Sequence, residues 1–246
     1  MRSLRVLGSG RAGASVASAL GRAGWDVCPV LGRDDDPSEA AEGVDLLVLA
    51  TPDGVIAEVA AAVRPDDRTV VAHLAGSLGL DVLAPHRLRA ALHPLVALPT
   101  AEIGARRLAD RATFAVAGEP AAALALVEEV VSDLGGRSFV VADDDRAAYH
   151  AAAVIASNHL VALLGQVERV ASSIGLPLDA YLDLIRVTVD NVAELGPAAA
   201  LTGPASRGDQ ATLDRHRAAL ALLGADEVAT YDALVVAARR LVRRPE

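Results

Sequence analysis

The chain has 246 residues, of which 52% are apolar and 22% are charged. That length suits one large domain or two smaller ones, and it is ample for a hydrophobic core. The 32 acidic and 23 basic side chains give a formal net charge of −9. This charge argues against nucleic acid and anionic membranes as partners, because both require a basic surface.

Every basic residue is an arginine, and the chain contains no lysine. The absence excludes Schiff-base lysines, phosphate-loop lysines and lysine general acids. The single cysteine, Cys28, excludes an internal disulfide and cysteine-based zinc or iron–sulfur sites. No signal-peptide core precedes the first strand-like run, and no uninterrupted apolar run reaches the roughly 18 residues of a membrane span. We therefore expect a soluble, cytoplasmic protein.

The first part of the chain alternates short apolar runs with helical stretches, which is typical of a doubly wound, mostly parallel sheet. The runs predicted as strands are Leu4–Gly8, Asp26–Leu31, Val44–Ala50, Thr69–Leu74, Ala90–His93, Thr113–Ala117 and Ser138–Ala142. Helices are predicted over Ala12–Ala23 and Val55–Val63. These elements indicate an α/β, Rossmann-like domain over residues 1–145.

After three consecutive aspartates the pattern becomes helical throughout. The predicted helices are Ala147–Ser173, Leu178–Leu195, Gln210–Leu223 and Glu227–Arg244. A polar loop, Leu201–Asp209, lies between the second and third of them. We therefore place a domain boundary near Arg146 and expect an all-helical domain over residues 146–246.

A glycine-rich turn, GSGRAG, joins the first predicted strand to the first predicted helix. It consists of Gly8, Ser9, Gly10, Arg11, Ala12 and Gly13. Between a strand and a helix, this pattern predicts a dinucleotide site. Gly8 permits the tight turn, Gly10 lets the backbone approach the pyrophosphate, and Gly13 allows close helix–strand packing. The diphosphate would lie at the positive end of the helix dipole. The alternative is a tight turn without a ligand.

The residues beyond the second and third strands bear on the choice of dinucleotide. Arg33 follows the second strand, where NADP-binding proteins use arginine and NAD-binding proteins an acidic residue. Together with Arg11 in the turn, it favours NADP, unless the aspartates that follow simply neutralise it. After the third strand, Thr51 and Pro52 should flank the cofactor. The alternative is an ordinary turn, and Asp53 is predicted to cap the next helix in either case.

Histidines end two neighbouring strands: His73 the fourth and His93 the fifth. Because the carboxyl ends of parallel strands meet at one edge, both should open on the same crevice as the glycine-rich turn. An imidazole there could act as a general acid, with Ser77 close by. The alternative for each histidine is a structural, hydrogen-bonded role.

The helical part carries further polar candidates. His150 and Asn158 place an imidazole and an amide on an otherwise apolar helix, for a substrate or for helix packing. Asn191 lies on the next helix. Arg207 is the cation of the polar loop and could clamp a substrate carboxylate. Its alternative is a salt bridge to Asp209, the predicted cap of the following helix.

The motifs GSGRAG, TPD, HLAGS, LHPL, YHAAAVIASNHLVALL and LTGPASRGD, in this order, resemble a bacterial family. That family has a Rossmann-like N-terminal domain and a C-terminal domain of unknown function, and the resemblance covers essentially the whole chain. Such proteins are similar to 6-phosphogluconate dehydrogenase, 3-hydroxyacid dehydrogenases and pyrroline-5-carboxylate reductase. The resemblance implies an NADP-dependent oxidoreductase, a homodimer formed by the C-terminal helices, and ketopantoate as a candidate substrate.

One departure from that pattern concerns the mechanism. The 3-hydroxyacid dehydrogenases keep a catalytic lysine one helical turn before an asparagine. Asn158 matches the asparagine, but Val154 stands where the lysine would be. The proton must then come from water or from an imidazole, and the candidates are His73, His93 and His150. Ser77 and Asn158 would orient the carbonyl, and the expected substrate is a small 2-oxo acid or imine. The alternatives are a regulatory or assembly protein that binds NADP without catalysis, and a purely structural protein.

Overall fold

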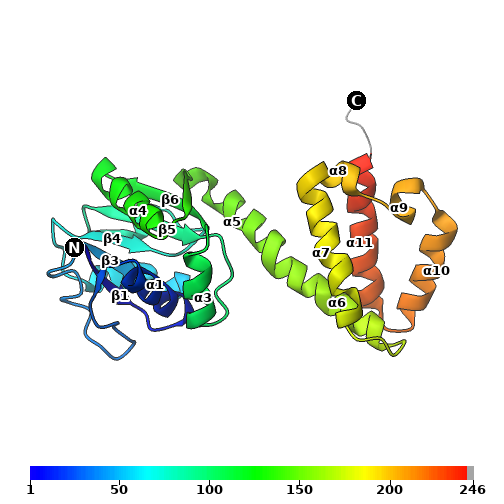
Figure 1. The fold of residues 1–246 in the computed structure, drawn as a ribbon, viewed down its shortest axis with the longest axis horizontal. Coiled ribbons are helices and arrows are strands. Elements are labelled where there is room, and N and C mark those ends of the chain that lie inside the picture. The colour runs from blue at the N-terminus through cyan, green and yellow to red at the C-terminus, as the bar shows by residue number, and fades with distance from the viewer. Residues whose placement is uncertain (243–246) are drawn as a thin grey trace. The chain divides into compact units, whose positions relative to one another are not determined.

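The computed structural model describes residues 1–242, and the chain divides into two compact units. The first, Met1–Ser157, contains a seven-stranded sheet, and the second, from Asn158 onward, is helical (Figure 1). The predicted α/β class with a helical C-terminal part is confirmed. The division falls inside the helix that starts at Arg146, so residues 146–157 belong to the sheet unit. The roles assigned to the two predicted domains remain proposals.

The sheet has the strand order β2-β1-β3-β4-β5-β6-β7. The strands are β1 (Ser3–Leu7), β2 (Asp26–Val27), β3 (Leu46–Leu49), β4 (Val70–His73), β5 (Arg89–Pro94), β6 (Thr113–Glu119) and β7 (Arg137–Val140). All neighbours run parallel except β5 and β6, which are antiparallel. The carboxyl ends of β1, β3, β4 and β5 therefore share one edge of the sheet.

The second strand is shorter than predicted. The apolar run Asp26–Leu31 pairs with β1 over only two residues, and Leu31 then forms a single bridge to Leu7. Pro29 interrupts the run, and proline cannot donate to a strand ladder. The chain nevertheless returns to the end of β1, so the segment after Leu31 begins beside the glycine-rich turn.

Helices cover both faces of the sheet. They are α1 (Arg11–Arg22), α2 (Ile56–Ala62), α3 (Ala101–Leu108) and α4 (Ala121–Asp133). One face buries alternate strand residues such as Val48 against α1, α3 and α4, and the other buries residues such as Leu49 against α2. Figure 1 shows α1 and α3 side by side. Neither α3 nor α4 was predicted, because α3 is short and the apolar residues of α4 surround the helix instead of forming one stripe.

The long helix predicted over Ala147–Ser173 is continuous but not uniform. It consists of the 3-10 turn η3 (Asp143–Asp145), α5 (Arg146–Val154), the π-helical segment η4 (Ile155–His159) and α6 (Leu160–Ser172). Single π-helical turns interrupt an α-helix and often occur at functional sites. By length and composition alone, Asp143–Ser172 is long and apolar enough to cross a membrane, a criterion that single helices of soluble proteins also meet.

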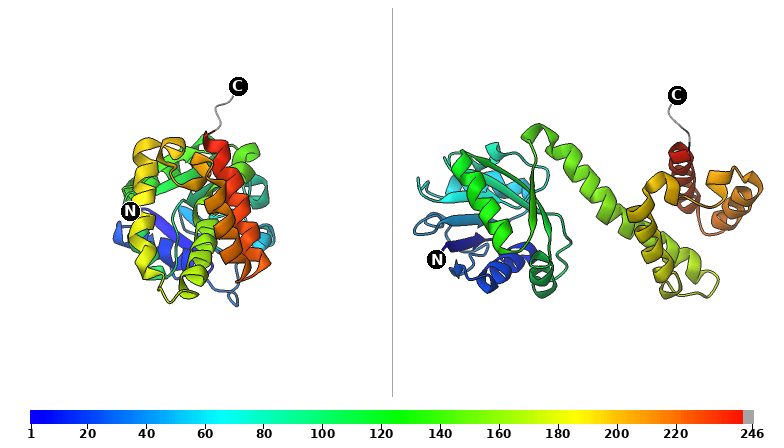
Figure 2. Two further views of the ribbon diagram at one scale, coloured as in Figure 1. Left: turned by 90° about the vertical axis from the view of Figure 1, so that its right-hand side faces the viewer. Right: turned by 45° about the horizontal axis from the view of Figure 1, so that its top comes forward.

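The second unit continues with α7 (Asp179–Leu195), α8 (Pro197–Ala200), α9 (Pro204–Arg207), α10 (Gln210–Ala221) and α11 (Ala225–Val242). Within this unit α10 packs against α11 (Figure 2). The predicted loop Leu201–Asp209 contains the single turn of α9. Asp209 caps α10 as predicted, because its side chain accepts the N–H of Thr212 at 3.0 Å. The last two residues of the predicted helix Glu227–Arg244 lie outside the described residues.

Candidate active site

The glycine-rich turn connects β1 to α1, as predicted. Gly8 has φ +120°, and a Cβ there would lie 2.5 Å from the carbonyl oxygen of Ala50. A Cβ on Gly13 would collide with the carbonyl oxygen of Gly8. Packing within the protein therefore requires glycine at both positions.

Gly10 differs from the other two glycines. A Cβ there would meet nothing within 4 Å, so the protein's own packing leaves that space open. Gly10 is also the N-cap of α1, and no side chain caps this end of the helix. The first turn of α1 contains no acidic residue. The turn thus combines open space, uncapped backbone N–H groups and the positive end of a helix dipole, which together fit a phosphate group.

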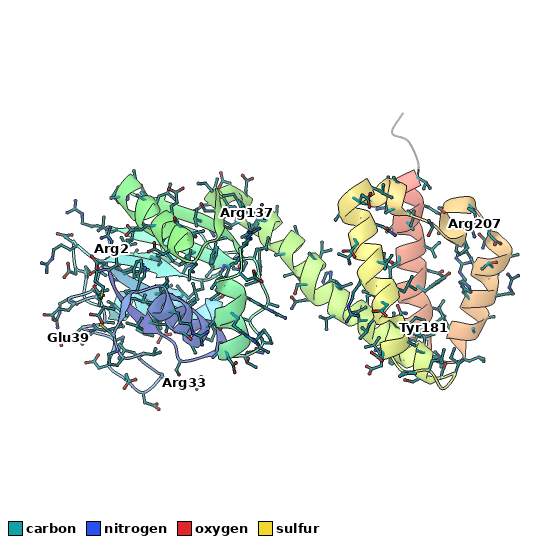
Figure 3. All side chains as sticks on the ribbon, in the orientation of Figure 1. Arg2, Arg33, Glu39, Arg137, Tyr181 and Arg207 are labelled. Atoms are coloured by element: carbon teal, nitrogen blue, oxygen red, sulfur yellow. The ribbon has the colours of Figure 1, made fainter. Side chains whose placement is uncertain are left out.

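Arg33 is exposed on the loop that follows β2 (Figure 3). Within residues 1–242 it forms no ion pair, so the aspartates after it do not neutralise it by direct contact. Asp35 instead accepts the backbone N–H of Gly32 at 2.6 Å, and Asp36 accepts that of Ser38 at 2.9 Å. The Arg33 guanidinium therefore remains available to an anion.

Thr51 and Pro52 follow β3 directly beside the turn. The backbone nitrogen of Thr51 would be 3.1 Å from a Cβ on Gly8, so this strand end touches the turn. The hydroxyl of Thr51 is buried and has no hydrogen-bond partner among the described residues. The predicted capping by Asp53 is wrong, because Pro52 occupies the cap position and no side-chain capping bond forms.

The strand register of β5, β6 and β7 builds the second part of the site. His93, Ala115 and Phe139 are register partners across these three strands, so their side chains share one face of the sheet. Tyr149 of α5 lies over this row, with its ring centroid 5.5 Å from that of His93 and 5.7 Å from that of Phe139. The small side chain of Ala115 leaves room for the tyrosine ring between the other two.

Tyr149, His93 and His150 form one polar cluster, which we call the His93 cluster. The Nδ1 atom of His93 lies 2.6 Å from the Tyr149 hydroxyl oxygen, and the rings of His93 and His150 meet edge to face at 5.8 Å. The loop after β4 lies close against both imidazoles. A Cβ on Gly76 would lie 2.6 Å from Cδ2 of His150 and 2.9 Å from Nε2 of His93.

The surroundings of the cluster keep His93 uncharged. Burial lowers the pKa of His93 to about 4, and positive charge at His150, Arg146 and His73 acts in the same direction. Burial raises the pKa of Tyr149, while the positive charge of Arg146 opposes that rise. At neutral pH the cluster therefore contains a neutral His93 and a protonated phenol.

His73 makes hydrogen bonds through both ring nitrogens. Nδ1 accepts the N–H of Ala75 at 3.2 Å, so Nε2 carries the proton and donates it to the carbonyl oxygen of Gly79 at 3.2 Å. The side chain is fully buried, and burial lowers its pKa to about 4. His73 thus holds the loop that contains Gly76 in its position against the His93 cluster.

Arg146 is a buried cation beside the cluster. Its side chain is 0% exposed, and its Nε lies 3.3 Å from Oδ1 of Asp143. The other carboxylate oxygen of Asp143 accepts the N–H of Leu80 at 2.9 Å. Nη1 and Nη2 of Arg146 have no partner among the described residues. Burial lowers the pKa of this guanidinium, which is the effect of removing a charge from water.

Sequence reasoning named neither Tyr149 nor Arg146 as a site residue. Tyr149 is one of three tyrosines in the chain and directly precedes His150, which is a signal that could have drawn attention to it. Arg146 follows three aspartates, and this charged sequence suggests a position at the surface. Local sequence spacing does not predict that its side chain is buried.

The remaining predicted site residues lie apart from hydrogen-bonded clusters. Ser77 is half-buried in the loop after β4 and makes no side-chain hydrogen bond within residues 1–242. Asn158, in η4, and Asn191, on α7, are exposed. Arg207, at the end of α9, is exposed (Figure 3) and forms no ion pair with Asp209 or any other described residue. These last three belong to the helical unit.

The sequence profile of a domain of unknown function, DUF2520, matches residues 112–238, which is more than half of the chain. The chain belongs to the DUF2520 family. This assignment confirms the resemblance drawn from the motifs, including the C-terminal domain of unknown function. No curated protein matches the DUF2520 chain in a sequence comparison.

Solved structures resemble the DUF2520 chain over nearly its full length. A Bacteroides fragilis protein assigned as an NADP oxidoreductase is 21% identical, with a TM-score of 0.81 over 97% of this chain and 98% of its own. A reductive aminase from Aspergillus terreus, in complex with NADPH and ethyl-5-oxohexanoate, is 17% identical with a TM-score of 0.73, over 98% and 94% of the two chains. A Plasmodium falciparum pyrroline carboxylate reductase with NADP bound is 12% identical with a TM-score of 0.62, over 98% of each chain. At these identities the likeness establishes a shared fold.

Proposed function

We propose that this DUF2520 protein is an NADPH-dependent reductase of a small 2-oxo acid or imine. One observation supports it most strongly. The sheet edge formed by the ends of β1, β3, β4 and β5 carries both an open, uncapped glycine-rich turn and a half-buried tyrosine–histidine pair. A dinucleotide and a proton donor are the two requirements of carbonyl reduction by hydride.

The proposed cofactor site consists of residues of the sheet unit. The turn from Gly8 to Gly13, including Ser9, Arg11 and Ala12, would hold the pyrophosphate. Arg33, which has no ion pair among the described residues, would contact the 2′-phosphate. Thr51 and Pro52 would flank the dinucleotide, which would give the buried Thr51 hydroxyl a partner. When bound, NADPH supplies the hydride that reduces the substrate carbon.

The His93 cluster is the proposed source of the proton in the reaction. His93 and His150 lie next to each other beneath Gly76, and His93 has no partner for Nε2 within residues 1–242. We assign proton supply to this cluster, and we assign to His73 the support of the loop that covers it. Ser77 and Asn158 are proposed to orient the carbonyl. Ketopantoate is the first substrate to test.

Arg207 and Asn191 are the proposed ligands of the substrate carboxylate. Arg207 is exposed and has no acidic partner within 4 Å among the described residues. A guanidinium in that state binds a carboxylate with two parallel hydrogen bonds. Asn191 offers an exposed amide on α7 that can donate to the same group.

The decisive experiment has two parts. Titration with NADPH and NADH tests the cofactor, and a preference for NADH would overturn the NADP assignment. A substrate screen then follows NADPH absorbance with ketopantoate first and a panel of 2-oxo acids and cyclic imines after it. We expect oxidation with at least one compound, lowered in His93→Ala and in Asn158→Ala. Unchanged turnover in both variants would refute the site assignment. Tight NADPH binding without oxidation of the panel would favour a regulatory protein instead.

We also propose that the protein is a homodimer joined by its C-terminal helices. Leu184, Val187 and Leu195 of α7 lie along one side of that helix, together with Asn191, and the three apolar side chains are 64%, 54% and 56% exposed. A row of this kind is costly in water and typical of an interface. Light scattering during size-exclusion chromatography should give twice the chain mass, and Leu184→Glu should shift the protein toward monomer. A cytoplasmic location remains a prediction.

A further inference from the structure

We infer that the hydroxyl of Tyr149 protonates the reduced substrate, that His93 returns the proton to Tyr149, and that Arg146 stabilises the phenolate between these steps. The inference rests on the proposed reductase function and names the acid that this function requires. Tyr149 is the catalytic residue in this assignment, and His93 and Arg146 act through it.

The chain contains a second tyrosine–histidine pair that provides an internal comparison. The hydroxyl of Tyr231 lies 2.7 Å from Nδ1 of His216, with ring centroids 5.8 Å apart, nearly the geometry of the Tyr149–His93 pair. This second pair is at the surface, beside an ion pair between Arg217 and Asp232 with a 2.7 Å contact. Its neighbouring cation is thus already matched by an anion.

The cation beside the Tyr149 pair is also in an ion pair, with Asp143, but it is buried and its guanidinium is only partly satisfied. Arg146 is fully buried, its Nη1 and Nη2 atoms have no partner among the described residues, and Asp143 satisfies only Nε. A buried cation with two unsatisfied nitrogens is unfavourable in a resting protein. It becomes favourable when a negative charge forms nearby, and the Tyr149 phenol is the acidic group of the cluster that can provide one.

The groups around Tyr149 account for the charge that it experiences. His93 faces it from β5 and Phe139 from β7, while Arg146 and His150 belong to its own helix. Asp143, in η3, has both oxygens engaged, with Arg146 and with the N–H of Leu80. His73, from β4, is kept neutral at pH 7 by burial, which lowers its pKa to about 4. Among these groups, Arg146 is the charge that favours the phenolate of Tyr149.

Protonation states at neutral pH favour Tyr149 over His93 as the acid. Burial and the charge of Arg146 hold the pKa of His93 at about 4, so His93 carries no extra proton to give at pH 7. The phenol, whose pKa burial raises, keeps its proton throughout that range. Neutral His93 can still donate from Nδ1 to a phenolate oxygen while Nε2 accepts a proton from elsewhere.

The proton transfers balance as follows. When the carbonyl carbon gains the hydride, the π electrons of the C=O bond move to oxygen, and that oxygen takes the Tyr149 hydroxyl proton. The phenolate is stabilised by the Nδ1–H of His93 and by the charge of Arg146. The Nδ1 proton then passes to the phenolate oxygen as Nε2 takes a proton from solvent, which restores the phenol and leaves His93 as its neutral Nε2–H tautomer. Proton exchange with solvent returns His93 to the Nδ1–H tautomer before the next turnover. Each turnover consumes one hydride and one solvent proton.

Two probes separate proton transfer from hydride transfer. Ketopantoate requires a proton on its carbonyl oxygen, whereas N-methyl-1-pyrrolinium carries a permanent charge and becomes a neutral amine by accepting hydride alone. Tyr149→Phe should lower kcat for ketopantoate by about 100-fold or more, which is the ordinary contribution of a general acid. It should leave the pyrrolinium rate and the NADPH affinity unchanged. Tyr231→Phe, which removes a hydroxyl from the matching surface pair, should change neither rate.

Each other outcome of this assay has a defined meaning. An unchanged ketopantoate rate in Tyr149→Phe, or an equal loss with both probes, would overturn the inference and leave the reductase function standing. If the wild type reduces the pyrrolinium but no 2-oxo acid of the substrate panel, protonation of a carbonyl is not part of the reaction and the inference fails. If the wild type oxidises NADPH with neither probe and with no compound of the substrate panel, the proposed function fails and the inference fails with it.

A measurement without cofactor tests the role of Arg146. In a Tyr181→Phe, Tyr231→Phe background, Tyr149 is the single tyrosine of the chain, and the ¹³Cζ resonance of labelled tyrosine reports its ionisation. Arg146→Gln should move this titration to higher pH, because a nearby cation favours the phenolate. An unchanged titration would refute the proposed role of Arg146.

Discussion

The Nδ1 atom of His93 lies 2.6 Å from the hydroxyl oxygen of Tyr149, although the two residues are 56 positions apart. His93 is held by the register between β5 and β6, and Tyr149 by its place near the start of α5. The pair is therefore supported by two rigid elements and not by a flexible loop. Geometry of this kind preserves the orientation of a catalytic group.

The three glycines of the turn should respond differently to alanine. We expect Gly10→Ala to fold with an unfolding free energy within about 0.5 kcal/mol of the wild type, because its Cβ meets open space. NADPH affinity should fall by about tenfold, or 1.4 kcal/mol, because the methyl group would occupy the proposed place of the phosphate. Urea unfolding followed by Trp25 fluorescence and NADPH titration measure the two effects.

Gly13→Ala is the matched control for this experiment. Its Cβ would collide with the carbonyl oxygen of Gly8, so we expect a loss of about 3 kcal/mol in unfolding free energy. If Gly10→Ala bound NADPH as tightly as the wild type, the turn would be a structural feature and not a phosphate site.

Stability should fall in mild acid because of His73 and His93. The pKa of each is about 4 in the folded protein against an ordinary 6.5. Between pH 6.5 and 4, the two imidazoles are therefore protonated in the unfolded chain but not in the folded protein. The free energy of unfolding should decrease as pH falls from about 6.5 to 4, by up to about 3 kcal/mol for each histidine. Urea unfolding at a series of pH values measures this slope.

His73→Asn should flatten that pH dependence, because it removes one of the two histidines whose pKa is lowered in the folded protein. His159→Asn, at an exposed position in η4, should leave the slope as it is. An unchanged slope in His73→Asn would show that this imidazole does not resist protonation in the folded protein.

Arg146→Met should separate stability from activity. The wild-type guanidinium is buried with two unpartnered nitrogens, and replacing a poorly compensated buried charge by an apolar side chain of similar size is often neutral or stabilising. We expect an unfolding free energy equal to the wild type or about 1 kcal/mol higher. Turnover with ketopantoate should fall at least about tenfold. Destabilisation by about 3 kcal/mol would instead indicate a structural role.

Arg33→Ala should weaken NADPH binding without affecting NADH. Loss of one charge-assisted contact to the 2′-phosphate is worth about 1.5–3 kcal/mol, which corresponds to roughly a 10- to 100-fold higher Kd. Arg22→Ala, at the other end of α1, is the control of equal charge change and should bind both dinucleotides as the wild type does. Equal weakening for NADPH and NADH would argue against a contact to the 2′-phosphate.

Much of the framework follows from local sequence. Strand–turn–helix chemistry around Gly8, Gly10 and Gly13 depends on residues close in the chain, so spacing alone predicts the turn. The apolar runs that become β3 and β4 are buried on both faces, and such continuous runs identify parallel strands without a partner being known. The capping by Asp209 is equally local. The helices α3 and α4 were not predicted, because a short segment and a segment whose apolar residues surround the helix both lack a clear period.

Tertiary structure alone decided which polar residues act together. His73, His93 and His150 are equivalent candidates in the sequence, yet the fold gives His73 two backbone partners and pairs His93 with Tyr149. The burial of Arg146 likewise depends on residues distant in the chain, because desolvation is a sum over everything that packs around a group. Sequence spacing determines backbone conformation over a few residues, whereas register across β5, β6 and β7 determines which side chains meet. The absence of lysine was therefore visible in the sequence, and the tyrosine that we infer takes its place was visible only in the fold.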